Sequence, residues 1–144
     1  GELSVNEEEL KNIQNEFYGE FANDVETVNA IKSVYENYHY LMDPHTAVAY
    51  SVYEKLDNSN LDKNIHTVIM STAHPFKFPT PIAKALGLDE TKEPYAILDE
   101  VSKVTGVKFP EKLTEVRNSE IRFSNVIDKA EIQDFVKKYI NDLK

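Results

Sequence analysis

Residues 71–79, with the sequence STAHPFKFP, gather side chains that can hold an anionic small molecule. They supply the hydroxyl of Thr72, the imidazole of His74 and the ammonium of Lys77 within one short stretch. Such groups bind phosphate or carboxylate through charge-assisted hydrogen bonds. The segment therefore predicts a binding site for a phosphorylated or carboxylated molecule. The alternative is a polar connection in which the histidine is satisfied by neighbouring protein groups.

Residues 43–49, with the sequence DPHTAVA, form a second candidate segment. Asp43 is a good N-cap and Pro44 suits the first helical position, so a helix is expected to begin here. His45 and Thr46 then lie in its first turn, where backbone N–H groups and the helix dipole favour an anion. The alternative is a capped helix start that binds no ligand.

The sequence does not predict a metal site or one of the common catalytic motifs. His45 and His74 lie far apart in the chain, without the close ligand spacing of known metal sites. The chain also has no Ser-His-Asp order, no Walker pattern and no glycine-rich phosphate loop. No metal is therefore expected.

Hydrophobic spacing and capping residues predict a largely helical chain. Residues 107–127 read as irregular, with residues 120–126 as a weak strand candidate, and residues 57–60 read as a turn. Glycine is expected to end three of the helices, at Gly19, Gly87 and Gly106. The predicted helices cover residues 10–17, 23–38, 43–56, 82–86, 94–105 and 128–140.

Residues 67–71, with the sequence TVIMS, are an unbroken and partly β-branched run that predicts a strand buried on both faces. The fold class expected from this strand is α/β. Residues 71–79 then follow the carboxyl end of the strand, where open α/β sheets bind ligands. Since one strand cannot form a sheet, its partners are expected in sequence outside this chain.

Composition narrows the class of protein. The chain has 144 residues, the size of one domain, and a net charge of −9, which argues against binding nucleic acid or an anionic membrane surface. No apolar run approaches the roughly 20 residues of a membrane helix, and no signal peptide is visible. The absence of cysteine is compatible with the cytosol, and we expect a cytoplasmic protein.

Residues 40–50 (YLMDPHTAVAY) and residues 71–79 together resemble the threonine synthase family. The family pattern reads approximately (D/E)PH(T/A)AVA, followed after a strand by TAHPAKFP, and the order and separation agree. The resemblance covers essentially the whole chain, although only these two motifs are specific. Phe76 departs from the pattern because the family usually carries a small residue there.

The resemblance implies a helix-rich C-terminal fragment of a tryptophan-synthase-β-like enzyme of fold type II, dependent on pyridoxal 5'-phosphate. Threonine synthases convert O-phosphohomoserine and water to threonine and phosphate, in threonine biosynthesis. Residues 1–144 are expected to be one segment of that enzyme. The region with the Schiff-base lysine and the glycine-rich loop would lie in the N-terminal part, its expected partner. This chain alone is therefore expected to be inactive.

The resemblance also assigns roles to the candidate residues. Thr72 is expected to face the pyridine nitrogen of the cofactor, because this group of enzymes has a Ser or Thr at that position. His74 and Lys77 are expected around the same cleft, in contact with the phosphate of the substrate. His45 and Thr46 are expected to line the same cleft, with a less direct role than Thr72, His74 and Lys77.

Two alternatives stay open. The first is a related pyridoxal-phosphate lyase that acts on another phosphorylated amino acid, such as phosphothreonine. The second is a non-catalytic α/β binding module that retains the anion-binding segments.

Overall fold

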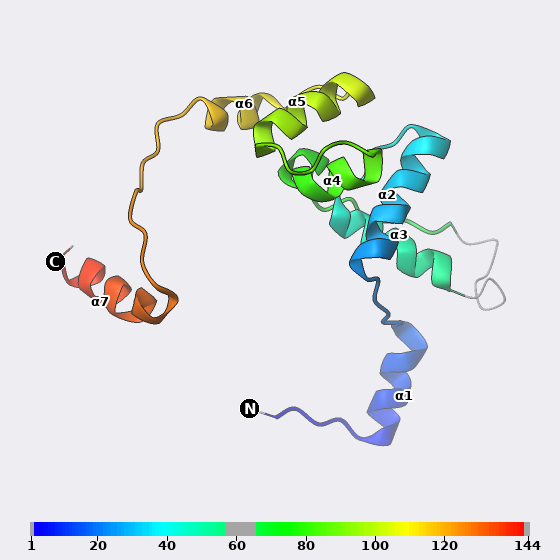
Figure 1. Cartoon of the computed structure of the whole chain (residues 1–144). Coiled ribbons are helices and arrows are strands. Elements are labelled where there is room, and N and C mark those ends of the chain that lie inside the picture. The colour runs from blue at the N-terminus through cyan, green and yellow to red at the C-terminus, as the bar shows by residue number, and fades with distance from the viewer. Residues whose placement is uncertain (1, 57–65, 143–144) are drawn as a thin grey trace. The chain divides into compact units, whose positions relative to one another are not determined.

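The computed structural model describes residues 2–56 and 66–142. Contacts divide the chain into an N-terminal unit, Gly1–Glu111, and a C-terminal unit, Lys112–Lys144. Both units are helical over their described residues (Figure 1). The elements are α1 (Glu7–Glu16), α2 (Asp24–Tyr38), α3 (Pro44–Lys55), η1 (Pro75–Lys77), α4 (Pro79–Leu86), α5 (Pro94–Thr105), α6 (Glu111–Arg117), η2 (Lys129–Glu131) and α7 (Ile132–Asp142).

The core of the N-terminal unit lies among α2, α3, α4 and α5. Helix α2 packs against both α3 and α4, and α4 packs in turn against α5. The apolar side chains that these helices and their connections bury form one core, because removing such surfaces from water is the main stabilising term in folding. The buried apolar residues are Ala30, Ile31, Val34, Leu41, Met42, Ala47, Phe76, Ile82, Ala83, Ala85, Ile97, Leu98 and Val101.

Local capping explains where α2 and α3 begin. The Asn23 side chain accepts from the N–H of Glu26 at 3.0 Å, and the Glu26 carboxylate accepts from the N–H of Asn23 at 2.8 Å. This reciprocal pair satisfies two N–H groups that a helix start leaves free. Asp43 caps α3, with Pro44 at its first position. The helix starts predicted at both places are confirmed.

The predicted α/β fold with a buried strand at residues 67–71 is wrong. The described residues contain helices and no strand. Val68 and Met70, expected inside, are 77% and 72% exposed. A strand is defined by hydrogen bonds to a neighbouring strand, and the described chain offers this run no such partner. The weak candidate at residues 120–126 is likewise irregular and exposed, and the turn predicted at residues 57–60 lies outside the described residues.

The end of α1 and the presence of α6 also differ from the sequence prediction. Helix α1 ends at Glu16, with Phe17 as an extended C-cap whose N–H bonds to Ile13 O, so Gly19 is not its cap. Helix α6 lies within the stretch predicted as irregular. It buries none of its residues, and its apolar positions are only Leu113 and Val116, too few to establish a helical period.

Helix α7 is an amphipathic helix in the C-terminal unit. Asp128 and Glu131 pair ahead of it as predicted, because the Glu131 carboxylate accepts from the backbone N–H of Asp128 at 3.1 Å and the N–H of Glu131 bonds the carbonyl oxygen of Asp128 at 2.9 Å. Ile132, Val136 and Ile140 follow one face of α7 and are exposed. Over residues 2–56 and 66–142, no helix combines the length and apolar character needed to span a membrane.

Gly87 and Gly106 end α4 and α5 in the left-handed conformation, with φ of 70° and 71°, as predicted. A Cβ atom at either position would meet nothing within 4 Å. Changing either glycine to alanine is therefore expected to cost about 1 kcal/mol of unfolding free energy, from backbone conformation alone.

Urea unfolding of the single variants measures this cost, and Gly19→Ala is the matched control. Gly19 has equal space for a Cβ atom and no positive φ, so its substitution is expected to change stability by less than about 0.5 kcal/mol. Equal effects at all three glycines would contradict the conformational explanation.

Candidate functional site

Asp43 organises the candidate site at the start of α3. Its side chain is buried, with 1% of the residue exposed. Oδ1 accepts from the backbone N–H of His45 at 2.9 Å and of Thr46 at 3.4 Å. Oδ2 accepts from the Thr46 hydroxyl. The carboxylate thus already binds the N–H groups that were expected to receive an external anion.

His45 is tied to Asp43 by one of its ring nitrogens. Its Nδ1 lies 3.2 Å from Asp43 Oδ1, while the residue stays exposed. The imidazole also meets the ring of Phe78 edge-on, with centroids 5.0 Å apart. The ring is therefore held by Asp43 at Nδ1 and by its contact with Phe78, while the residue remains exposed.

The charge of Asp43 is stabilised by its donors. Burial raises the pKa of this carboxyl. The hydrogen bonds from the Thr46 hydroxyl, the two backbone N–H groups and the His45 ring together lower the pKa by more than burial raises it. The net result is a pKa below the usual range. Asp43 is therefore ionised near neutral pH and acts as a hydrogen-bond acceptor.

The charge of Asp43 acts on the imidazole of His74. Its Nδ1 accepts from the N–H of Phe76 at 3.2 Å, as a cap of η1. Burial lowers the pKa of His74, Asp43 opposes this shift and Lys77 adds to it. The neutral imidazole is thus favoured. The contact between the rings of His45 and Phe78 joins the two motif segments.

The other three predicted site residues, Thr46, Thr72 and Lys77, differ in how far they are exposed. Thr72 is exposed in the irregular stretch that precedes η1, and Lys77 is exposed at the end of η1. Thr46 is buried, with its hydroxyl directed to Asp43. Contact of these side chains with a cofactor or substrate stays a prediction.

A cleft of about 440 Å³ lies beside His45. That volume suits a small molecule. Sequence reasoning missed Thr80 and Lys84, although their spacing of four residues places them on one face of α4, directly after the second motif. Lys84 pairs with Glu90 at 3.3 Å. The cleft is lined by Asp24, Thr27, Val28, Pro44, His45, Phe78, Thr80, Pro81 and Lys84.

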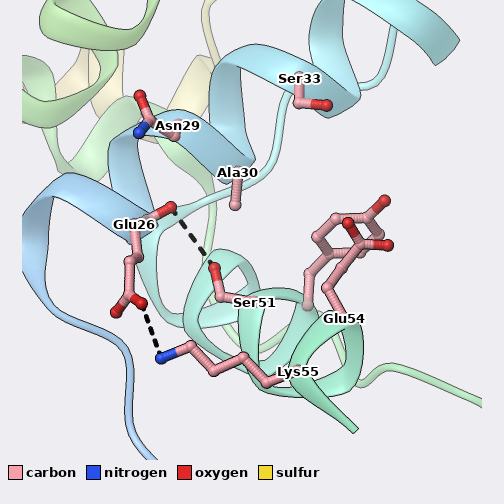
Figure 2. A pocket seen from close by; sticks show the side chains of 8 residues that line it. Glu26, Asn29, Ala30, Ser33, Ser51, Glu54 and Lys55 are labelled. Atoms are coloured by element: carbon pink, nitrogen blue, oxygen red, sulfur yellow. Dashed lines mark hydrogen bonds and ion pairs between the residues drawn. The ribbon is translucent and has the colours of Figure 1, made fainter. Parts of the chain in front are cut away.

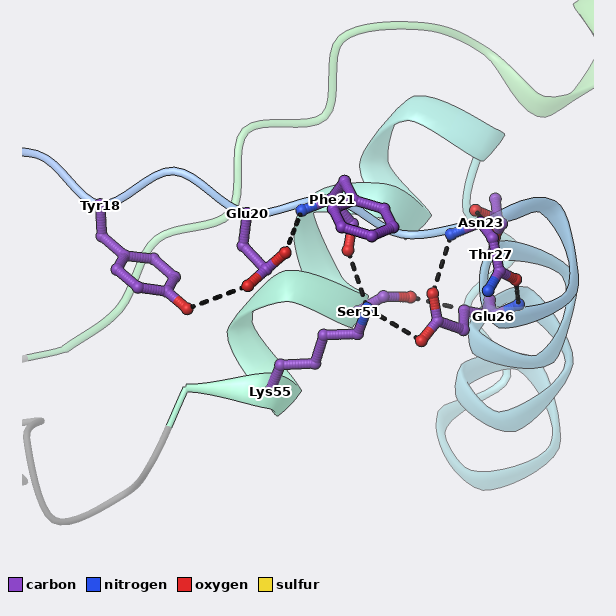
Figure 3. Close-up of polar contacts among 8 residues, drawn as sticks. All are labelled: Tyr18, Glu20, Phe21, Asn23, Glu26, Thr27, Ser51 and Lys55. Carbon is purple, nitrogen blue, oxygen red and sulfur yellow. Dashed lines mark hydrogen bonds and ion pairs between the residues drawn. The ribbon is translucent and has the colours of Figure 1, made fainter.

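A second hollow, of about 300 Å³, lies between α2 and α3 (Figure 2). Its polar groups hold the two helices together. Lys55 Nζ lies 2.8 Å from the Glu26 carboxylate and 2.7 Å from Phe21 O, and Ser51 Oγ lies 3.5 Å from Glu26 O (Figure 3). The hydrogen bond from Lys55 lowers the pKa of Glu26. These contacts link the C-terminal half of α3 to α2 and to the segment that precedes it.

The chain fits a pyridoxal-phosphate cofactor at one point. The exposed hydroxyl of Thr72 is a suitable partner for a pyridine nitrogen. The four glycines stand apart, at positions 1, 19, 87 and 106, so this sequence supplies no glycine-rich loop for the cofactor phosphate. The described residues also form no group of three or more His, Asp or Glu side chains that could hold a metal ion.

Comparison with known proteins gives a consistent result. The family model "Threonine synthase, C-terminal" matches residues 46–140. Threonine synthase of Schizosaccharomyces pombe is 37% identical over 86 residues, and that of Saccharomyces cerevisiae is 31% identical over 127 residues. The mouse protein named threonine synthase-like 1 is 37% identical over 84 residues. No solved structure gives a significant match.

The aligned regions are a small part of these relatives. They cover 60% of this chain and 17% of the S. pombe protein, and 84% of this chain and 25% of the S. cerevisiae protein. For the mouse protein the shares are 58% and 11%. The chain thus spans a quarter or less of the length of these curated relatives.

Proposed function

Because the chain belongs to the threonine synthase family, we propose that it forms part of an enzyme that converts O-phosphohomoserine and water to threonine and phosphate. The observation that carries the proposal is the family match over residues 46–140, which includes the whole second motif. The contact between His45 and Phe78, which joins the two motif segments beside a cleft of about 440 Å³, supports it.

In this proposal Thr72 contacts the pyridine nitrogen of pyridoxal phosphate. Bound cofactor would supply an electron sink for substitution at the carbon chain of the substrate. A neutral hydroxyl does not force the ring nitrogen to stay protonated, as a carboxylate would. Thr72 would therefore moderate that sink. Its exposed position next to the motif histidine supports this role.

The substrate phosphate is assigned to His74 and Lys77. Lys77 offers an exposed ammonium, and His74 lies three residues before it. His45 and Thr46 are proposed to support the residues that contact the substrate. Thr46 donates a hydrogen bond to Asp43, and Asp43 in turn bonds the ring of His45.

The N-terminal part of the same enzyme is the proposed partner. It would supply the Schiff-base lysine and the loop that binds the cofactor phosphate. The glycines of this sequence are dispersed and form no such loop, which supports placing the binding of the cofactor phosphate in the N-terminal part. The cytoplasmic location and the single segment expected for residues 1–144 stay predictions.

Phosphate release from O-phosphohomoserine by the full-length enzyme, with and without pyridoxal phosphate, tests this function. We expect release that depends on the cofactor, and a loss of about tenfold or more in kcat for Thr72→Val, equivalent to about 1.4 kcal/mol of transition-state stabilisation. Thr67→Val is the matched control. Thr67 is exposed in the same irregular stretch, so its substitution should leave the rate unchanged.

Each other outcome has a definite meaning. Release unaffected by Thr72→Val keeps the function and removes the role of Thr72. Bound cofactor without release points to a related lyase that acts on another phosphorylated amino acid. Failure to bind the cofactor points to a non-catalytic module.

A further inference from the structure

The C-terminal unit, Lys112–Lys144, has no core of its own, since none of its described residues is buried. A unit this small without a packed core is usually held by disulfide bonds, a metal ion or another protein surface. The chain has no cysteine, and its described residues form no group that could hold a metal ion. The unit therefore needs a protein surface to pack against.

Helix α7 carries the face that such packing would use. Its apolar residues recur every three or four positions and so share one side of the helix, an arc of about 140°. The polar residues follow the other side. Phe135 is half-buried and the other apolar residues are 47–57% exposed. The apolar face of α7 consists of Ile132, Phe135, Val136, Tyr139 and Ile140.

A hollow of about 340 Å³ adjoins this face beside Phe135. Its lining combines apolar and charged side chains, which is the usual composition of a protein interface with an apolar centre and a polar rim. The hollow could receive an apolar side chain from a partner. It is lined by Ile127, Ala130, Glu131, Asp134, Phe135 and Lys138.

We propose that the apolar face of α7 packs against the part of the enzyme that precedes the region present in this chain. The proposal rests on the proposed function, in which the chain is one part of a longer enzyme, and names a surface that joins the parts. The family model described as C-terminal extends to residue 140 and so includes most of α7. The alignment with the S. cerevisiae relative covers 25% of that protein, so three quarters of it lies outside the aligned region.

Two other occupants suit this face less well. Helices that lie on membranes are rich in lysine and arginine on their polar side. In α7, Asp134 and Asp142 balance Lys137 and Lys138, and the whole chain has a net charge of −9. A second copy of the chain would lose translational freedom on binding, whereas a partner in the same polypeptide acts at a high effective concentration.

Hydrogen exchange followed by mass spectrometry tests the docking of α7. A helix of 11 residues without a partner is marginal in water. In the 144-residue chain, the amides of α7 are therefore expected to exchange almost as fast as those of an unfolded peptide. In the full-length enzyme, we expect the same amides to exchange at least about a hundredfold more slowly.

Val136→Glu in the full-length enzyme tests whether the apolar face provides this protection. Glutamate has a higher helix propensity than valine, so a loss of protection would not come from a weaker helix. Burying its carboxylate is unfavourable, and we expect exchange in α7 to become at least about tenfold faster. Asn141→Glu is the matched control, because Asn141 lies on the polar side of α7, and it should leave the exchange unchanged.

Several results would overturn the proposal. Fast exchange in both chains, or equally slow exchange in both, would mean that the rest of the enzyme does not cover α7. Protection that rises with protein concentration would indicate a second copy. Protection that appears only with vesicles of anionic phospholipid would indicate a membrane surface. Equal effects of Val136→Glu and Asn141→Glu would exclude the apolar face as the contact.

These outcomes are separable from a failure of the proposed function, because hydrogen exchange does not depend on catalysis. Slow exchange of α7 in a full-length enzyme that releases no phosphate from O-phosphohomoserine keeps the docking and rejects the reaction. Release of phosphate by an enzyme in which α7 exchanges fast does the converse.

Discussion

Phe76→Ala is expected to lower the free energy of unfolding of the N-terminal unit by about 3–5 kcal/mol. Phe76 is 2% exposed, and its ring meets those of Phe109 and His74 edge-on, with centroids 5.3 and 5.2 Å apart. Alanine would leave a cavity between partners that were packed around an aromatic ring.

Urea unfolding followed by far-ultraviolet circular dichroism measures this loss. Phe76→Leu retains much of the buried volume and should cost about 1.5 kcal/mol or less. Phe123→Ala removes an exposed ring and should change stability by less than about 0.5 kcal/mol. A loss below about 1 kcal/mol for Phe76→Ala would mean that the ring is not part of the core.

Asp43→Ala is expected to lower the free energy of unfolding by about 2–3 kcal/mol. The variant removes the acceptor of two backbone N–H groups and of the Thr46 hydroxyl. Thr46 is buried, so its hydroxyl would lose its partner where water does not readily replace it. Such unsatisfied groups cost more than an average hydrogen bond contributes.

Glu93→Ala is the matched control for Asp43→Ala in the same unfolding measurement. The Glu93 side chain also accepts from two backbone N–H groups at the start of a helix, at 2.9 and 3.1 Å. Its site is exposed, so water can replace the carboxylate, and we expect a loss of about 1 kcal/mol. Similar losses in both variants would show that burial adds nothing to the cap at Asp43.

The helices that position the site were predictable because their ends carry local signals. Asn23 with Glu26, and Asp43 with Pro44, act through side chains only a few residues away. Gly87 and Gly106 end α4 and α5 by supplying a backbone conformation that other residues avoid. Interactions this short do not depend on the remainder of the fold.

The strand expected at residues 67–71 shows where such reasoning fails. Val68 and Ile69 are β-branched apolar residues of the kind found in buried strands. A strand also needs hydrogen-bond partners from distant parts of the sequence. Apolar composition alone did not reveal that Val68 is exposed in this chain.

The candidate site was predictable in its residues but only partly in its geometry. The two motifs marked His45, Thr46, Thr72, His74 and Lys77 by residue type. The sequence did not show that Asp43 already fills the helix start of α3 and bonds three neighbouring groups there. Thr80 and Lys84 carried no motif, and became candidates only once α4 was seen beside His45.

The irregular and mostly exposed run at residues 66–73 has a consequence for handling the protein. Proteases bind their substrates in extended form, and exposed connections are their preferred cutting sites. Hydrolysis near Val68 or Met70 would separate α2 and α3 from α4 and α5 along the chain. Because α2 packs directly against α4, the two pieces would stay associated as a nicked complex. A single band in a native gel would then hide a chain already cut beside its second motif.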